Sequence, residues 1–576
     1  MQKNKQAAIC LLALLLVIGY CIESYYLFTF NDHPCEDAYI TYRFAKNFAE
    51  GNGPVFNEGD RVEGYSNFLW MAGISCACKL GFDMPGFSRF VCWLSNTLTF
   101  LLVWFIPFRY FCTRGFSSLV APLLYVLFLP FHYSATSGLE TAPYTFLIVL
   151  CALAILWDHN RPLPFAAASI LLLLIALTRP EGILFFAFYA AYLFLRRLIN
   201  KESLRPYVPG FIIFIVGYSL FMLWRFSYYH ALVPNTYYAK GSFPLLIRVC
   251  LGMFTARCFV TRYPYFVIIL FMLWKARKLN AGQRALAPLT CFIAAGLTFS
   301  ICFSGFDWVP FFRYTLPVVP LLIILCAIIF AQLWNSVLSQ APRAQRIIWG
   351  GITAGCFLLA AEQFYADLLF SFRVRDVDAF VYHNQQVFGA WLKKEVGTTG
   401  TVCIGDVGRI AYFSEVKILD IVGLTSRDFA LLRKQYVSPE LEFPLCSINF
   451  NLCKEKEREL LLKLQPDYVM LYNARIKIAP TYFGSAAGIV EHEDFRQRYE
   501  YVSRFNIIPS FSSLSWPKPY YFNPMLDLSA GLLAWIYDGW GYDIYVRRDS
   551  PCKRFKIEFY PDDRIKNIKV IQAAIP

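Results

Sequence analysis

The chain has 576 residues, of which 57% are hydrophobic and 16% are charged, and its mean hydropathy is +0.44. Soluble domains have about 45–50% apolar and about 25% charged residues, so the composition excludes a soluble globular protein and a disordered one. Residues 1–370 carry 27 Lys and Arg and 16 Asp and Glu, whereas the shorter segment 371–576 carries 27 and 24. We therefore expect a membrane domain over 1–370 and a soluble domain over 371–576.

The N-terminus carries Lys3 and Lys5 before a long apolar run. This pattern predicts an uncleaved first span with a cytoplasmic N-terminus, and a cleaved signal peptide is the alternative. Further apolar runs of about spanning length are centred near Leu101, Tyr125, Leu150, Leu171, Ala187, Phe214, Ile268, Ala294, Leu322 and Cys356.

The run from Phe68 to Leu80 is short, and charge decides its interpretation. If it does not cross, the connectors rich in Lys and Arg all face the cytoplasm, as the positive-inside bias requires. The chain is then a polytopic α-helical membrane protein of about eleven spans with a C-terminal α/β domain outside. The net charge of +14 is explained by this topology and not by affinity for nucleic acid.

The first outer loop, residues 31–86, opens with a helical pattern. The apolar residues Ile40, Phe44 and Phe48 recur every four positions, and polar residues form a stripe on the opposite side. The pattern predicts an amphipathic helix over 36–50 that ends at Gly51 and is suited to lying flat on a bilayer. Asp37 at its start is either a helix cap or a catalytic acid, and Glu36 beside it strengthens the catalytic interpretation.

Short outer connectors collect residues suited to a polar site. Carboxylates, amides, Arg and aromatic rings hold the hydroxyls and the apolar face of a sugar. The candidates for sugar or acceptor binding are Arg61, Glu63, Tyr65, Asn67, Glu140, Glu181, Asn235, Tyr238, Asp307 and Trp308. A guanidinium fork fits a phosphate, and the cationic candidates for a phosphate are Arg179, Lys240, Arg313 and Arg43. Arg179 has the alternative of pairing with Glu181.

The tail, 371–576, begins with a predicted helix through His383 and Trp391. Buried or alternating patterns predict strands at Thr401 to Ile404, Val416 to Ile421, Tyr468 to Tyr472, Tyr499 to Phe505 and Tyr542 to Arg548. Helix and strand in alternation indicate a small α/β domain. No dinucleotide-binding fingerprint completes the Gly405–Gly408 segment, so we expect no nucleotide cofactor.

Several of these motifs, taken in order, resemble GT-C fold glycosyltransferases. The group most similar contains the mycobacterial terminal β-(1→2)-arabinofuranosyltransferase. The matching segments are Glu36–Arg43, Val62–Asn67, Ser137–Thr141, Thr178–Gly182, Pro234–Lys240, Asp307–Trp308 with Arg313, Gly405–Gly408 and Asp420–Leu424. The group usually has two Asp at Glu36-Asp37 and Gly-Gly-Asp-Trp at Gly305–Trp308, so these two departures leave the identity of the sugar open.

The resemblance implies a polyprenyl-phosphate sugar donor, an acceptor glycan outside the membrane, and a catalytic base at the position of Asp37. We therefore predict a multi-pass glycosyltransferase of the bacterial inner membrane that acts on a cell-envelope glycan or glycolipid, with a periplasmic C-terminal domain. The alternatives are an O-antigen-type ligase or polymerase and a lipid or solute transporter. No cofactor or metal is expected, although Glu36 with Asp37 leaves a divalent-cation site open as an alternative.

Overall fold

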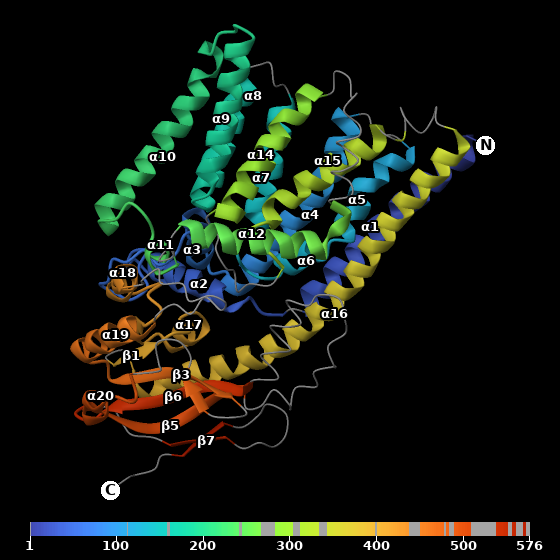
Figure 1. The fold of residues 1–576 in the computed structure, drawn as a ribbon. Helices are drawn as coiled ribbons and strands as arrows, with labels where there is room; N and C mark the ends of the chain where they lie inside the picture. The colour runs from blue at the N-terminus through green and yellow to red at the C-terminus, as the bar shows by residue number, and fades with distance from the viewer. Residues whose placement is uncertain are drawn as a thin grey trace.

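The computed structural model describes residues 2–30, 32–111, 113, 115–157, 162–240, 245–266, 283–302, 311–332, 334, 342–397, 400–436, 450–476, 480–482, 489–508, 537–550, 556–559 and 568–571. A large helical part lies against a smaller α/β part, and both are visible in Figure 1. Helix α16 (Arg343–Glu395) begins at the far end of the helical part and ends within the α/β part. The predicted fold class, a helical part followed by a C-terminal α/β part, is therefore confirmed, and the boundary expected after residue 370 lies inside α16.

The helical part follows the apolar runs of the sequence. Its helices before α16 are α1 (Gln2–Phe30), α2 (Glu36–Ala49), α3 (Phe68–Lys79), α4 (Met84–Tyr110), η1 (Gly115–Leu119), α5 (Val120–Val126), α6 (Pro130–Ser134), α7 (Thr141–Trp157), α8 (Pro162–Thr178), α9 (Gly182–Ile199), η2 (Arg205–Tyr207), α10 (Val208–Tyr229), α11 (Asn235–Lys240), α12 (Leu245–Arg262), α14 (Gln283–Cys302), η3 (Leu316–Val318) and α15 (Val319–Gln332). Each predicted span coincides with a helical segment, except the run near Ile268, which lies outside the described residues.

Five helical segments of the described chain are long and apolar enough to cross a membrane: Gln6–Phe30, Met84–Tyr110, Gly182–Ile199, Arg205–Tyr229 and Ala344–Phe372. Several shorter apolar helices accompany them, so the total of about eleven crossings stays a prediction. Helix α3 has 12 residues and is about 18 Å long, well below the roughly 30 Å of a bilayer core. Its length agrees with the prediction that this run does not cross.

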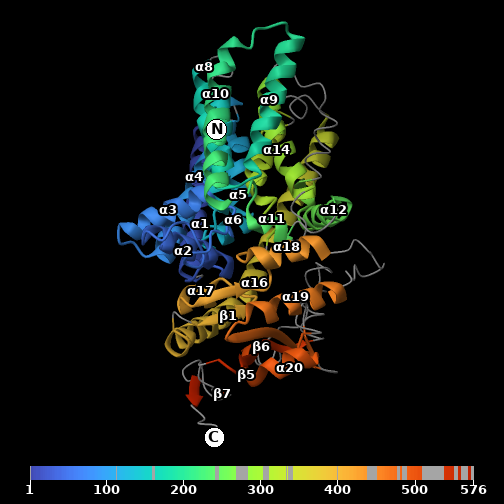
Figure 2. The same ribbon diagram turned by 90° about the vertical axis from the view of Figure 1, so that its left-hand side faces the viewer.

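Helix α12 was not predicted as a separate element. It lies across the direction of the long helices, close to the boundary with the α/β part (Figures 1 and 2). Arg262 at its end donates through Nε to Asp367 of α16 at 2.9 Å, and both side chains are buried. Arg262 and Asp367 therefore join α12 to the long helix.

The main sheet of the α/β part is mixed and has the strand order β2-β1-β3-β6-β5, with β4 paired to β3, and β7 and β8 form a separate two-stranded sheet. Strands β1, β2 and β3 are parallel to one another, whereas β6 is antiparallel to both of its neighbours. The strands are β1 (Thr401–Ile404), β2 (Lys417–Asp420), β3 (Tyr468–Ile476), β4 (Pro480–Tyr482), β5 (Tyr499–Ile508), β6 (Tyr537–Arg547), β7 (Lys556–Phe559) and β8 (Ile568–Ile571), and the helices are α17 (Arg409–Ser414), α18 (Arg427–Tyr436), α19 (Phe450–Leu464) and α20 (Glu493–Arg498). All five predicted strands are present.

Helix α2 shares one hydrophobic core with the α/β part. Tyr39, Tyr42 and Phe44 belong to the same buried cluster as Leu392 of α16 and Ile404 of β1. The helix packs between α3 and α17, and every residue from Ala38 to Ala45 is buried. Protein therefore covers both stripes of α2 between Ala38 and Ala45, so this part of the helix does not lie on a bilayer as its pattern suggests.

Candidate functional site

The outer connectors named from the sequence meet at one end of the helical part. The segments 32–67, 135–141, 178–182, 230–235 and 311–315 all lie at the end that faces the α/β part (Figure 1). The connector 199–205 joins α9 to η2 at the opposite end. The alternation of chain direction through α7, α8, α9 and α10 produces this arrangement.

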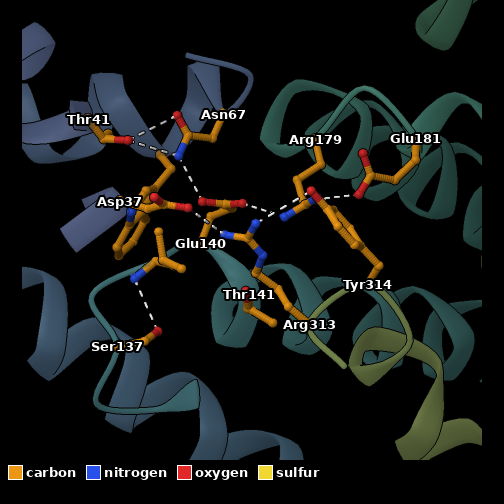
Figure 3. A network of polar contacts seen from close by, with 12 residues as sticks. Asp37, Thr41, Asn67, Ser137, Glu140, Thr141, Arg179, Glu181, Arg313 and Tyr314 are labelled. Atoms are coloured by element: carbon orange, nitrogen blue, oxygen red, sulfur yellow. Dashed lines mark hydrogen bonds and ion pairs between the residues drawn. The ribbon is translucent and has the colours of Figure 1, made fainter. Parts of the chain in front are cut away.

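A buried ion-pair group forms the centre of the site (Figure 3). Arg179, in the turn between α8 and α9, donates through Nη1 to Glu140 Oε1 at 2.5 Å and through Nε to Glu181. Asn67 donates through Nδ2 to Glu140 Oε2 at 2.8 Å and exchanges hydrogen bonds with Thr41 of α2. The Arg179, Glu140 and Glu181 side chains are each no more than 9% exposed, so the surrounding protein holds them in fixed positions.

Asp37 and Arg313 lie beside this group. The Arg313 guanidinium donates through Nη1 to Asp37 Oδ2 at 3.3 Å and through Nη2 to the Tyr314 hydroxyl at 3.4 Å. The Tyr314 ring also lies 5.1 Å from the guanidinium carbon of Arg179. Figure 3 shows the Arg313 guanidinium between Asp37 and Tyr314. The structure thus brings together six of the predicted site residues: Asp37, Asn67, Glu140, Arg179, Glu181 and Arg313.

Exposure distinguishes Asp37 from the other acids of the group. Its side chain is 40% exposed, whereas that of Arg313 is 9% exposed and that of Glu140 is 6% exposed. Asp37 therefore presents a solvent-accessible carboxylate next to a largely buried guanidinium. A carboxylate in this position can accept a proton from a bound hydroxyl, and the guanidinium can stabilise an anion.

The turn at Ser137 and Gly138 contacts the start of α2, where Asp37 lies, and also α3. The Cys35 N–H donates to the Ser137 carbonyl at 3.0 Å, and the Trp70 Nε1–H donates to the Gly138 carbonyl at 3.2 Å. Gly138 has a φ of +73°, and a Cβ there would lie 2.4 Å from the Tyr42 hydroxyl. Only glycine fits this turn without strain, and the turn places Glu140 next to Asp37.

Glu36 has a different environment from its neighbour. Its Oε1 accepts a hydrogen bond from the Gly408 N–H at 2.6 Å, so it contacts the α/β part and not Arg313. A Cβ on residue 408 would lie 2.2 Å from the Glu36 carbonyl oxygen, and this close approach requires glycine. Burial and the nearby Asp406 and Asp37 carboxylates raise the pKa of Glu36 to about 8, although Arg409 opposes the shift.

The raised pKa of Glu36 predicts a pH-dependent stability. From about pH 4.5 to about pH 8 the unfolded chain releases this proton, whereas the folded chain retains it. The free energy of unfolding should therefore decrease as the pH rises through this window. Burial also raises the pKa of Asp406, to about 6, so Asp406 adds to the decrease in stability in the lower part of this pH range. Melting temperatures of wild type and Glu36→Gln between pH 5 and pH 9 measure the effect.

Glu36→Gln keeps an acceptor for the Gly408 N–H but removes the proton equilibrium, so its melting temperature should depend less on pH. Glu58→Gln is the matched control, because Glu58 is an exposed acid of the same loop. Parallel curves for wild type and Glu36→Gln would show that Glu36 titrates at its ordinary pKa.

Arg43 is placed away from the Asp37 group. Its guanidinium is buried and donates to the carbonyls of Phe56, Ala411 and Val416 at 2.8, 2.6 and 2.7 Å. It also donates to Asn57 Oδ1 at 3.2 Å. Backbone carbonyls occupy the donors that a phosphate would need, so Arg43 joins the first loop to the α/β part and is not placed to bind a donor phosphate.

A second buried group joins the first loop, α10 and the α/β part. Arg225 donates through Nε and Nη2 to Glu63 Oε1 at 3.2 and 3.0 Å, and the Tyr65 hydroxyl lies 3.0 Å from that of Tyr229. Asn235 donates through Nδ2 to the Gly423 carbonyl at 2.7 Å. Glu63, Tyr65 and Asn235, which we predicted as sugar-binding residues, are therefore buried in contacts that hold the loop.

Two further sugar-binding candidates are more accessible. Arg61 is exposed and its guanidinium carbon lies 4.9 Å from the centre of the Tyr228 ring. Tyr238 is half-buried, and the Lys434 amino group lies 4.8 Å from the centre of its ring. Asp307, Trp308 and the side chain of Lys240 lie outside the described residues.

Among the described residues, no group of three or more His, Cys, Asp or Glu side chains is arranged to hold a metal ion. The Glu36 and Asp37 carboxylates accept hydrogen bonds from different partners, Gly408 and Arg313. This arrangement does not supply a shared set of oxygen ligands, and metal dependence stays an open prediction.

Sequence reasoning missed three residues that organise the site: Arg225, Arg409 and Tyr314. Arg225 is a charged residue inside an apolar run, and such residues are commonly functional or paired. Arg409 directly follows the Gly405–Gly408 segment, and Tyr314 is adjacent to Arg313. These positions were therefore visible in the sequence, but their partners were not.

Residues 375–523 match a family described as a domain of unknown function, DUF8728. No curated protein matches the chain at a significant level. Similar solved structures include ArnT from Cupriavidus metallidurans bound to undecaprenyl phosphate, with a TM-score of 0.41 and 15% identity over 73% of this chain and 77% of that chain. The apo state of the same protein has a TM-score of 0.46 and 13% identity, over 80% of this chain and 93% of that chain.

The archaeal oligosaccharyltransferase AglB from Archaeoglobus fulgidus, in complex with an inhibitory peptide and a dolichol-phosphate, is also similar. Its TM-score is 0.49 at 11% identity, over 93% of this chain and 88% of that chain. At these identities the likeness concerns the fold, and it assigns no role to any residue of this chain.

Proposed function

We propose that the chain is a membrane glycosyltransferase of the GT-C type. It moves a sugar from a polyprenyl-phosphate donor to a cell-envelope glycan or glycolipid on the outer face of the bacterial inner membrane, and its α/β part is periplasmic. The observation that supports this proposal most directly is the accessible Asp37 carboxylate 3.3 Å from the buried Arg313 guanidinium. The ordered motifs that resemble arabinofuranosyltransferases favour a pentofuranose as the sugar.

The transfer needs a base and an anion-stabilising group on the same side of the membrane. An acceptor hydroxyl oxygen attacks the anomeric carbon of the donor, and its proton passes to the Asp37 carboxylate. The bond between the anomeric carbon and the phosphate oxygen breaks, and its electron pair leaves with the phosphate. Arg313 stabilises this leaving group in a site where protein limits the screening of charge.

Arg313 is better placed for the phosphate than Arg179. The Nε and Nη1 donors of Arg179 are already occupied by Glu181 and Glu140. Arg313 shares its Nη1 with an exposed carboxylate at the longer distance of 3.3 Å, so a phosphate can compete for it. We therefore assign the leaving phosphate to Arg313, with Lys240 as a second cation. Glu140, Glu181 and Asn67 position Arg179 and the loop, and Arg61 and Tyr238 are the accessible candidates for contact with the acceptor.

The test is a transfer assay with purified protein and a defined polyprenyl-monophosphate sugar, compared between a pentofuranose and a hexose. Consumption of a monophosphate-linked sugar with formation of a glycosylated acceptor is the expected result. Use of a diphosphate-linked glycan in its place would identify a ligase or polymerase. Uptake of a solute without any glycosidic product would identify a transporter, and either outcome would replace the proposal.

Arg313→Gln should raise the KM for the donor and lower turnover. A charge-assisted hydrogen bond contributes roughly 1.5–3 kcal/mol, so kcat/KM should fall roughly 10- to 100-fold. Arg109→Gln is the matched control, since Arg109 is an exposed cation in the last turn of α4. An Arg313→Gln enzyme with the kcat/KM of the control would exclude Arg313 from phosphate binding.

A further inference from the structure

A partly open pocket lies beside the Asp37 group, on the side formed by α1 and α16. It is lined by the segment that follows α1, at His33 and Cys35, by the turn 133–137, and by Arg375 and Asp378 of α16. None of these residues has a role in the proposed transfer. The pocket therefore needs its own explanation.

Arg375 has no counter-ion among the described residues of this pocket. Its Nε is buried and has no hydrogen-bond partner, and no ion pair in the described part of the chain includes it. The guanidinium carbon lies 3.8 Å above the centre of the Phe30 ring, which covers one face of the group. Asp378, the acid that lines the same pocket, is already paired with Arg409 at 2.8 Å and with His33 at 3.4 Å. A buried guanidinium donor without a hydrogen-bond partner destabilises the folded protein unless an anion binds it.

The pocket lies where two candidate membrane spans end. The apolar segment of α1 ends at Phe30 and that of α16 ends at Phe372, and the centres of these two rings are 5.0 Å apart. Exposed aromatic side chains lie on the same two helices, at Tyr25, Tyr26 and Tyr365. Tyrosines gather at the level of lipid headgroups. Arg375, three residues beyond Phe372, is thus at headgroup level, next to apolar helix faces that can accept acyl chains.

We propose that this pocket binds the phosphate group of a membrane lipid. The guanidinium fork of Arg375 matches two phosphate oxygens, and Tyr133 supplies a phenolic hydroxyl at the pocket wall. The lipid tails then lie along the exposed faces of α1 and α16. The proposal does not depend on glycosyl transfer, because it concerns a cation that the transfer does not use.

Binding of short-chain lipids to the full-length, delipidated protein in detergent tests the proposal, with native mass spectrometry and a fluorescence titration as readouts. The probes are dioctanoyl phosphatidic acid, dioctanoylglycerol, which lacks the phosphate, and inorganic phosphate. We expect one bound phosphatidic acid, much weaker binding of dioctanoylglycerol, and weak binding of inorganic phosphate. Arg375→Gln should weaken phosphatidic acid binding roughly 10- to 100-fold, and Arg375→Lys, which keeps the charge, should weaken it less.

Two control variants separate this pocket from other cations. Arg346→Gln removes an exposed cation near the other end of α16, and Arg313→Gln removes the cation beside Asp37. Both should bind phosphatidic acid as wild type does. Equal affinity of wild type and Arg375→Gln would overturn the proposal, as would loss of binding in Arg313→Gln. Inorganic phosphate bound as tightly as the lipid, through Arg375, would assign the pocket to a soluble phosphate and overturn the lipid assignment.

Discussion

Replacement of Asp37 by asparagine should lower turnover by roughly 10²–10⁴-fold, which is the usual contribution of a general base. The donor should still bind, because asparagine keeps the size of the side chain and leaves Arg313 in place. The kcat should therefore fall while the KM for the donor changes little. A transfer assay with purified wild type and Asp37→Asn at saturating acceptor measures both quantities.

A role for Asp37 in helix capping predicts a different result. The N-cap residue of α2 is Cys35, and Asp37 is the second residue of the helix. Its charge near the helix N-terminus contributes about 0.3–1 kcal/mol to stability, which Asp37→Asn would lose without a large change in rate. Glu58→Gln, in an exposed part of the same loop, is the matched control. Near-normal turnover by Asp37→Asn would exclude Asp37 from catalysis, and Glu140 and Asp307 would be the next acids to test.

Replacement of Arg409 by methionine should lower the free energy of unfolding by roughly 3 kcal/mol, near the lower end of the range for breaking a buried ion pair. The Arg409 side chain is fully buried and donates to both Asp378 oxygens at 2.8 and 2.9 Å, whereas the Asp378 side chain is 32% exposed. Salt bridges to Arg409 hold the pKa of Asp378 at about 2 against the effect of burial. Loss of the guanidinium removes both of these hydrogen bonds from the carboxylate and leaves it with the His33 ring at 3.4 Å. Thermal and denaturant unfolding of the purified protein measure the effect.

The effect of Arg409 should extend to activity. Arg409 also donates through Nη2 to the Pro34 carbonyl at 2.7 Å, three residues before Asp37. Arg409→Met should therefore reduce turnover as well as stability. The double variant Arg409→Met/Asp378→Asn should recover part of the stability, because the unpaired carboxylate is gone. Lys417→Met, at an exposed pair with Asp60 at 3.9 Å, should cost less than about 1 kcal/mol. A double variant no more stable than Arg409→Met would contradict this account.

These contacts connect the α/β part to the loop that carries Asp37. Gly408, Arg409 and the carbonyl groups of Ala411 and Val416 all bind residues of the first loop, on either side of Asp37. Asn57 pairs with both backbone groups of Ile418, at 2.8 and 3.0 Å. The first loop is thus folded onto the α/β part, which holds the start of α2 at a fixed position relative to Arg313.

The residues of the site were largely predictable from the sequence, although their partners were not. Acids and Arg at the edges of apolar runs are costly in a membrane and therefore informative, and this reasoning selected Asp37, Glu140, Arg179 and Arg313. The same reasoning included Arg43, Glu63 and Asn235, which the structure places in buried contacts. A charged side chain that binds a ligand and one that binds a distant carbonyl look alike in a single sequence.

The sequence by itself determined the helical and α/β regions, the helix that begins at Glu36, and the five strands of the tail. Hydrophobic periodicity and charge are local signals, and each of these elements is decided by residues close together in the chain. Only the tertiary structure decided that Glu36 contacts Gly408 while Asp37 contacts Arg313, because these partners lie hundreds of residues away. Contacts over such separations depend on how the helices pack. Packing removes water from some polar groups, which must then find partners in the protein, and no local sequence pattern predicts these partners.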